Sequence, residues 1–288
     1  MTGKLMLLAS LLSAGAGWAQ DPPVFRVEAR LVEVYATVRD NHGRYLDGLT
    51  KDRFQVLDNG VPQTVTAFES NSARLTCAIL VDTTGSMAGV LPVVKNSVMH
   101  LIDELRDEDS VGIYSFNTRL NRLQDFTEDK AAAKQAVLRT RAAGSTALFD
   151  AIAELAYEIS PRNGKKAMVV FTDGADNSSL LNAQAAVKRA KKAGVPVYAI
   201  AEGEALGTRT LLDELKDIAE MTGAQSYLAR RTKDIENIFA QISDDLQHTY
   251  MLAFKAPPNP GPKWRTIQLS VSGLKEPRIR AKEGYLPE

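Results

Sequence analysis

Side chains that carry oxygen atoms alternate along the stretch VDTTGSM, residues 81–87. Asp82 offers a carboxylate, and Thr84 and Ser86 each offer a hydroxyl. The stretch follows an apolar run and precedes a long helical pattern, so these groups lie where a strand gives way to a helix. Neither a tight turn nor a helix cap alone requires all of them together, and we therefore ask what their oxygen atoms bind.

Two later segments carry similar side chains. The sequence GSTALFDAI places Thr146 just before a predicted helix, and FTDGADN places Asp173 directly after the strand-like run AMVVF. In open α/β sheets, ligands bind in the crevice beyond the carboxyl ends of the strands. Because all of these segments are predicted at such ends, we expect Asp82, Thr84, Ser86, Thr146 and Asp173 to converge on one edge of one sheet.

The chemistry of this set indicates a metal ion. All of the groups are hard oxygen donors, and no histidine or cysteine lies near them in the sequence. Such donors favour Mg²⁺, Mn²⁺ or Ca²⁺ over zinc or copper, and we expect Mg²⁺. If three neutral hydroxyls are the inner ligands, the carboxylates compensate the charge only in part, and a position stays free for one more oxygen. We therefore predict that the metal binds a glutamate or aspartate of a partner protein, and we predict no catalysis.

The elements that must position these residues alternate between strands and helices from about residue 72 to residue 249. Several strands are continuously apolar, as expected when helices cover both faces of a parallel sheet. Amphipathic patterns at helical spacing lie between them. We therefore predict an α/β fold with a doubly wound, mostly parallel sheet. Its predicted strands are residues 75–81, 111–116, 167–172, 195–201 and 226–229, with a further edge strand at RLQDFT.

The flanking segments, residues 20–71 and 250–288, have the character of β-strands. In the first, Asp58-Asn59-Gly60 separates two strand patterns and predicts a hairpin. Neither flank alone would form a stable domain, because small sheets bury little apolar surface. We therefore predict that the two flanks pair into one small β-sandwich, with the α/β domain inserted between them.

The motifs D-x-T-x-S, G-x-T-x-L and T-D-G together resemble the metal-ion-dependent adhesion site of von Willebrand factor type A domains. The resemblance covers about residues 73–249, and the flanks more loosely resemble exported bacterial proteins that carry a related domain. It implies a Rossmann-like fold and an adhesion function. It also implies that the last helix, residues 232–249, shifts on binding. The family more often has serine at the position of Thr84. The resemblance further implies hydroxyl ligands from Thr84, Ser86 and Thr146, with Asp82 and Asp173 acting directly or through water.

The N-terminal residues 1–19 have the pattern of a signal peptide. Lys4 precedes the apolar residues 5–16, and Gly17-Trp18-Ala19 offers a small-x-small cleavage site. The apolar stretch is short for a bilayer span, although an uncleaved anchor is an alternative. We expect export to the periplasm, the cell surface or the medium.

The composition indicates a disulfide-free, electrically balanced chain. No segment after residue 19 is apolar enough to cross a membrane, and the single cysteine, Cys77, cannot form an internal disulfide. The chain has 35 basic residues (lysine and arginine) and 35 acidic residues (aspartate and glutamate). This balance gives no net positive charge for binding nucleic acid or an anionic membrane. We expect a monomer.

Each motif also has a purely structural interpretation. Ser86 and Thr146 are typical helix N-caps, and Asp173 followed by glycine is typical of a turn. Residues 176–178 would cap the helix that runs to residue 193. Asp150, one turn into its helix, would be solvated or lie behind the metal ligands.

Two other functional classes compete with metal-dependent binding. In a haloacid-dehalogenase-like phosphohydrolase, Asp82 would be the nucleophile, Asp173 and Asp176 would hold Mg²⁺ against a phosphate, and Lys165 or Lys166 would neutralise its charge. The absence of an acid at position 84 and the unused G-x-T-x-L motif argue against this class. The other alternative is a scaffold that needs no metal.

The three histidines give no support to a hydrolase that uses a histidine base. They have no partner motif, and each is predicted to be a surface or cap residue: His42, His100 and His248.

Overall fold

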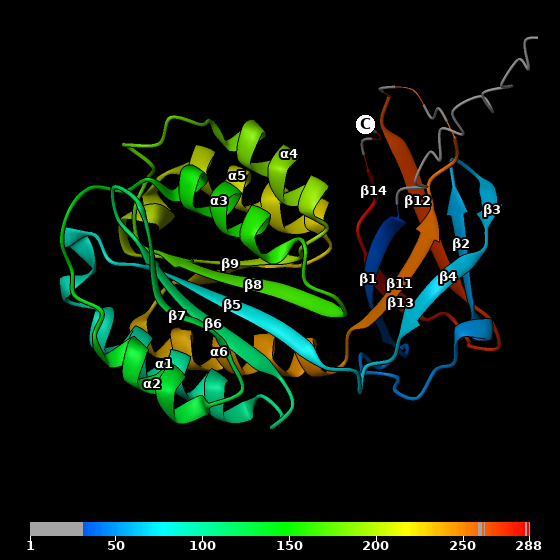
Figure 1. Cartoon of the computed structure of the whole chain (residues 1–288), viewed down its shortest axis with the longest axis horizontal. Coiled ribbons are helices and arrows are strands. Elements are labelled where there is room, and N and C mark those ends of the chain that lie inside the picture. Colours follow the sequence, from blue (N-terminus) through cyan, green and yellow to red (C-terminus); the bar gives the residue numbers. More distant parts are fainter. Residues whose placement is uncertain (1–30, 259–260, 262, 286, 288) are drawn as a thin grey trace, which may run out of the picture.

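The computed structural model describes residues 31–258, 261, 263–285 and 287. The predicted signal peptide, residues 1–19, lies outside this range, as does the beginning of the N-terminal flank. Within it, the chain forms an α/β domain and a β-module that lie side by side (Figure 1). Among the described residues, no helix is long and apolar enough to span a bilayer.

The α/β domain is built on a six-stranded sheet with the strand order β10-β9-β8-β5-β6-β7. All neighbouring pairs are parallel except β6 with β7. Strand β7 is the edge strand predicted at RLQDFT, and it runs antiparallel to its neighbour. The predicted α/β fold with a mostly parallel sheet is confirmed. The strands are β5 (Leu75–Asp82), β6 (Ser110–Phe116), β7 (Leu120–Thr127), β8 (Lys165–Thr172), β9 (Val197–Glu202) and β10 (Ser226–Ala229).

Helices cover both faces of this sheet (Figure 1). Side chains alternate along β5, so Cys77 and Ile79 pack in the core under α1, α2 and α6, whereas Ala78 and Leu80 pack under α3, α4 and α5. This double burial explains why the central strands are continuously apolar. The helices are α1 (Leu91–Glu104), α2 (Lys130–Leu138), α3 (Leu148–Ile159), α4 (Ala183–Ala193), α5 (Arg209–Thr222) and α6 (Thr232–Gln247), with 3₁₀ turns η1 (Lys51–Arg53), η2 (Gly85–Ala88) and η3 (Gly203–Gly207).

The β-module consists of two four-stranded sheets, with strand orders β13-β1-β11-β4 and β14-β12-β2-β3. Each sheet combines strands from before and after the α/β domain, as the fold prediction requires. A shared apolar core, which includes Val34, Val56 and Phe254, lies between them. The strands are β1 (Leu31–Arg39), β2 (Phe54–Asp58), β3 (Val61–Gln63), β4 (Val65–Glu69), β11 (Tyr250–Lys255), β12 (Arg265–Val271), β13 (Arg278–Ala281) and β14 (Gly284–Tyr285).

The hairpin predicted in the N-terminal flank joins β2 to β3. Asp58 pairs with Val61, which leaves Asn59 and Gly60 as the loop. Their φ angles are 49° and 78°, and a two-residue turn of type I′ requires positive φ at both positions. Asparagine and glycine tolerate this conformation better than other residues, so the local sequence determines the turn.

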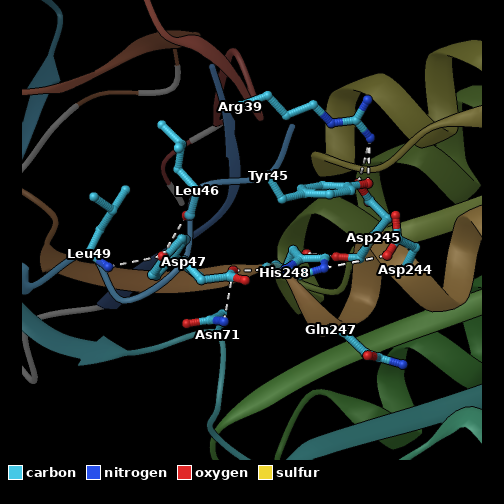
Figure 2. A network of polar contacts seen from close by, with 12 residues as sticks. Arg39, Tyr45, Leu46, Asp47, Leu49, Asn71, Asp244, Asp245, Gln247 and His248 are labelled. Carbon is cyan, nitrogen blue, oxygen red and sulfur yellow. Dashed lines mark hydrogen bonds and ion pairs between the residues drawn. The ribbon is translucent and has the colours of Figure 1, made fainter. Parts of the chain in front are cut away.

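A polar network joins the α/β domain to the β-module, and its centre is Asp245 near the end of α6 (Figure 2). This carboxylate is 1% exposed. It accepts hydrogen bonds from the hydroxyls of Tyr198 on β9, at 2.5 Å, and of Tyr45, at 2.9 Å. It also forms ion pairs with Arg280 of β13 and, at 3.8 Å, with Arg39 of β1. The buried charge is therefore compensated by two arginines of the β-module, and hydrogen bonds reach it from both halves of the molecule.

His248 belongs to the same junction. Its ring stacks on Tyr45 with centroids 4.3 Å apart, and its nitrogens lie 2.8 Å from Asp47 and 3.4 Å from Asp244 (Figure 2). His248 is the C-cap residue of α6, as predicted, and its contacts with Tyr45 and Asp47 add a role that the sequence did not indicate, because that segment lies about two hundred residues away in the chain. His248 helps to join the two halves of the molecule.

Both lysines at the start of β8 are buried beside the β-module. Lys165 Nζ donates to the carbonyl oxygens of Asn71, at 3.0 Å, and of Leu246, at 3.4 Å. Lys166 Nζ pairs with Glu33 of β1 at 3.0 Å. Lys165 thus ties the segment that enters the α/β domain to the helix that leaves it.

Candidate metal site

The predicted site residues of the first and third motifs lie at the carboxyl ends of β5 and β8, which are adjacent in the centre of the sheet. The chain enters β5 beside the β-module and runs to the opposite end of the domain (Figure 1). The edge that carries these residues therefore faces away from the β-module.

Asp82, the last residue of β5, is fully buried. Its Oδ1 accepts a hydrogen bond from the backbone N–H of Thr84 at 2.9 Å, and its Oδ2 accepts one from the Thr172 hydroxyl at 2.8 Å. Burial raises the pKa of Asp82 to about 6; the two hydrogen bonds act in the opposite direction, and the charge of nearby Asp173 adds to the rise. A cation at this place would favour the ionised carboxylate.

A chain of polar contacts connects the ends of the two strands. Thr84 Oγ1 lies 3.1 Å from Ser86 Oγ, and Ser86 Oγ donates to Asp173 Oδ1 at 3.0 Å. Side chains about ninety residues apart in the sequence thus lie within direct contact. The structure brings Asp82, Thr84, Ser86 and Asp173 together, as the motif analysis predicts.

Thr146 lies beside this chain of contacts. The residue is 4% exposed, and a Cβ built on Gly174, the residue after Asp173, would lie 3.8 Å from Thr146 Oγ1. Its backbone N–H donates to Asn177 Oδ1 at 3.0 Å, and its carbonyl accepts from the N–H groups of Asn177 and Ser178. Its hydroxyl forms no hydrogen bond within the described part of the chain, so it is available to a ligand.

The structural alternatives for the hydroxyls are wrong. Helix α1 begins at Leu91, well after Ser86, and the residue at its N-cap makes no side-chain cap. The N-cap of α3 is Ala147, again without a side-chain cap, so Thr146 does not cap that helix. Neither hydroxyl is therefore explained by capping.

The caps proposed for the helix that runs to residue 193 are also wrong. That helix, α4, begins at Ala183, and its N-cap is Asn182, whose side chain accepts from the N–H of Ala185. Asp176 instead accepts from the N–H of Phe149 at 2.9 Å and so contacts the first turn of α3. The loop between β8 and α4 is therefore longer than predicted. Its polar side chains bind backbone N–H groups at and just before the start of α3.

Asp150 is not simply solvated. Its Oδ2 and Oδ1 accept hydrogen bonds from the N–H groups of Leu180, at 2.8 Å, and Leu181, at 2.9 Å. Because both oxygens are used by backbone donors, we assign Asp150 to the support of the loop between β8 and α4.

Sequence reasoning missed one contributor to the site and one acidic residue near it. Thr172 orients Asp82 through its hydroxyl, and its position just before Asp173 in the T-D-G motif is the signal that could have indicated this. Glu202 ends β9, the strand next to β8, and its pKa is raised by burial and by the charge of Asp173. The sequence places Glu202 directly after the predicted strand of residues 195–201, and this position could have indicated an acid near the site.

The donor set fits a hard divalent cation. Hydroxyl and carboxylate oxygens are ligands of Mg²⁺ and Ca²⁺, whereas zinc and copper prefer nitrogen or sulfur. No group of three or more histidine, cysteine, aspartate or glutamate side chains in the described ranges could hold a metal ion. A cation at this edge would therefore depend on the hydroxyls of Thr84, Ser86 and Thr146.

Asn177 is expected to position Thr146 for the metal. In Asn177→Ala, the N–H of Thr146 loses its 3.0 Å acceptor, so the hydroxyl is held less firmly. We expect Mg²⁺ affinity to fall about tenfold, as for other groups that orient metal ligands. Isothermal titration calorimetry measures the change. The exposed Asn163→Ala is a matched control and should bind as the wild type does.

The parallel sheet with helices on both faces and an oxygen-rich edge at two central strands defines a class of ligand-binding α/β domains. The sequence matches the von Willebrand factor type A domain family over residues 77–241. The chain therefore belongs to this family, whose members are known for protein–protein interaction and adhesion.

Among curated proteins, the chain is 33% identical over 113 residues to the voltage-dependent calcium channel subunit alpha-2/delta-2 of Homo sapiens. The match covers 34% of this chain and 10% of that subunit, so the chain spans about a tenth of its curated relative.

Solved structures share the fold. A von Willebrand factor type A protein from Catenulispora acidiphila superimposes with a TM-score of 0.54 at 14% identity, over 91% of this chain and 75% of that one. Proximal thread matrix protein 1 from the mussel byssus, with a zinc-occupied MIDAS motif, gives a TM-score of 0.53 at 20% identity. That alignment covers 64% of this chain and 48% of the mussel chain.

Proposed function

We propose that this chain is a metal-dependent protein-binding module. Asp82, Thr84, Ser86, Thr146 and Asp173 would hold a divalent cation, Mg²⁺ in preference to Mn²⁺ or Ca²⁺. The bound cation would supply an open coordination position for a glutamate or aspartate carboxylate of a partner protein. The observation that carries this proposal is the continuous contact from Thr84 through Ser86 to Asp173, with the unpaired hydroxyl of Thr146 beside it.

The arrangement supports binding and not phosphate hydrolysis. Lys165 and Lys166 lie at the opposite end of β8 from Asp173, about 25 Å away at the rise of an extended strand. Asp176, the other acid that a phosphohydrolase would need, accepts hydrogen bonds from backbone N–H groups of Phe149 and Ser179. We infer that the chain is not an enzyme.

The proposal includes an extracytoplasmic location and no nucleic-acid partner. The signal-peptide pattern of residues 1–19 supports export, and the balance of 35 basic and 35 acidic residues supports the absence of a polyanionic partner. We propose that the mature chain acts as a monomer.

The test is a calorimetric titration with Mg²⁺ of the wild type and of Thr146→Ala. Loss of one hydroxyl ligand is expected to weaken binding by at least about tenfold. The neighbouring Ser145→Ala is a matched control, because Ser145 is exposed and its hydroxyl makes no hydrogen bond within the described residues. Mg²⁺ binding that is indifferent to Thr146 would contradict the proposed site, and no binding by the wild type would favour a metal-independent scaffold.

A further inference from the structure

An apolar side chain projects from the loop that follows the candidate metal site. Leu180 is 96% exposed, and Tyr157 of α3 is 80% exposed. Both line a groove of ≈ 860 Å³ between α3 and α4. Single exposed hydrophobic residues are common on protein surfaces, so the surroundings of Leu180 decide whether it has a function.

The backbone that carries Leu180 is held in place. The N–H groups of Leu180 and Leu181 donate to the two oxygens of Asp150. Ser179 Oγ accepts from the N–H of Asp150 at 3.0 Å and donates to Asp176 Oδ2 at 2.6 Å. An exposed leucine on so constrained a loop loses little conformational freedom when a partner covers it, which favours its use as a binding contact.

The same loop contacts the candidate metal site. The carbonyl of Thr146 accepts hydrogen bonds from the N–H groups of Asn177 and Ser178, each at 3.0 Å. Ser178 is only two residues from Leu180, a span of at most about 7 Å. A partner that places a carboxylate at the metal can therefore reach Leu180 without a second binding segment.

The charge on the far side of the groove suits an acidic partner. Helix α4, with the sequence AQAAVKRAKKA, carries four basic residues and no acidic one. Arg189 and Lys192 of this helix line the groove, whereas α3 contributes Glu154 and the already engaged Asp150. Among the described residues, Arg189 has no ion-pair partner. Basic groups beside a carboxylate-binding metal would steer and orient an acidic segment.

We propose that the partner-binding surface extends from the metal site across Leu180 into the groove between α3 and α4. Its occupant is an acidic protein segment that carries an apolar side chain beside the carboxylate bound to the cation. The apolar side chain packs on Leu180 and Tyr157, and a further acid of the segment faces Arg189. This inference rests on the proposed function, because the metal fixes the first carboxylate.

The experiment uses a display library of random peptides selected against the full mature chain in Mg²⁺. We expect the enriched peptides to contain an acidic residue followed at fixed spacing by an apolar one. Synthetic versions are then titrated against Leu180→Ser, where we expect binding at least about tenfold weaker, typical of a lost interface anchor. Leu138→Ser is the matched control, since Leu138 is 50% exposed and lies at the end of α2.

Mg²⁺ affinity, measured in parallel for each variant, separates the two proposals. Leu180→Ser should keep wild-type Mg²⁺ affinity while its peptide affinity falls. Equal peptide affinity of Leu180→Ser and Leu138→Ser, or a selection that enriches no peptide with an apolar residue, would overturn the extended surface and leave the metal site standing. Peptides that bind equally well in EDTA and to Thr146→Ala would instead overturn the metal-dependent function.

Discussion

Replacement of Asp82 by alanine is expected to abolish detectable Mg²⁺ binding, a loss of more than about 100-fold, while the protein remains folded. Asp82 is the most deeply buried carboxylate of the site, and its hydrogen bonds from Thr84 and Thr172 orient the loop that carries the hydroxyl ligands. Without it, a cation would keep only the charge of Asp173 among the proposed ligands. Calorimetry gives the affinity, and circular dichroism in urea gives the free energy of unfolding.

The stability of Asp82→Ala without metal separates a binding role from a structural one. The variant loses two hydrogen bonds, but it also loses a buried carboxylate beside Asp173. These effects oppose one another, so we expect the metal-free unfolding free energy to change by no more than about 1 kcal/mol. Excess Mg²⁺ should stabilise the wild type, by about 2.7 kcal/mol at one hundred times the Kd, and leave the variant unchanged. Loss of cooperative unfolding would show that Asp82 is structural.

Replacement of Asp245 by alanine is expected to lower the free energy of unfolding by about 3 kcal/mol, because removal of one partner leaves a charge uncompensated at a buried junction. Arg280 would lose its ion-pair partner, and the hydroxyls of Tyr45 and Tyr198 would lose a common acceptor. Urea unfolding followed by circular dichroism measures the loss.

The adjacent acid, Asp244, provides the matched control. Its side chain is 59% exposed, and its contact with His248 is 3.4 Å long. Exposed ion pairs contribute about 0–1 kcal/mol, so Asp244→Ala should remain within that range of the wild type. Equal effects of the two substitutions would contradict the assignment of Asp245 as the centre of the junction.

The sequence is most informative where local pattern and global fold agree. The continuously apolar runs of β5, β8 and β9 could be predicted as strands, because helices bury both faces of each. The convergence of Asp82 and Asp173 followed from their places at strand ends, since adjacent parallel strands end at the same edge of a sheet. The turn at Asn59 and Gly60 was predictable because only a few residues adopt its backbone angles readily.

Contacts between the loop after β8 and the region around the start of α3 were not predictable in the same way. Asp150, Asp176 and Asn177 bind backbone groups of a segment far away in the sequence, and such partners leave no periodic signal. The junction around Asp245 has the same character, because its partners come from both flanks and from β9. Side-chain type predicted that these residues were polar, but only the tertiary arrangement determines which groups they satisfy.

The interleaving of the two flanks in the β-module has a consequence for folding. The whole α/β domain separates strands β1 to β4 from β11 to β14 in the sequence, so the edges of the early strands stay unpaired until distant segments meet. Closing so long a loop is entropically unfavourable, and a folded insertion reduces that cost by holding its own ends together. Lys165 does this, because its ammonium group binds both the entering segment at Asn71 and the departing helix at Leu246. We therefore expect the α/β domain to form before the β-module, whose two sheets close once both tails are held together.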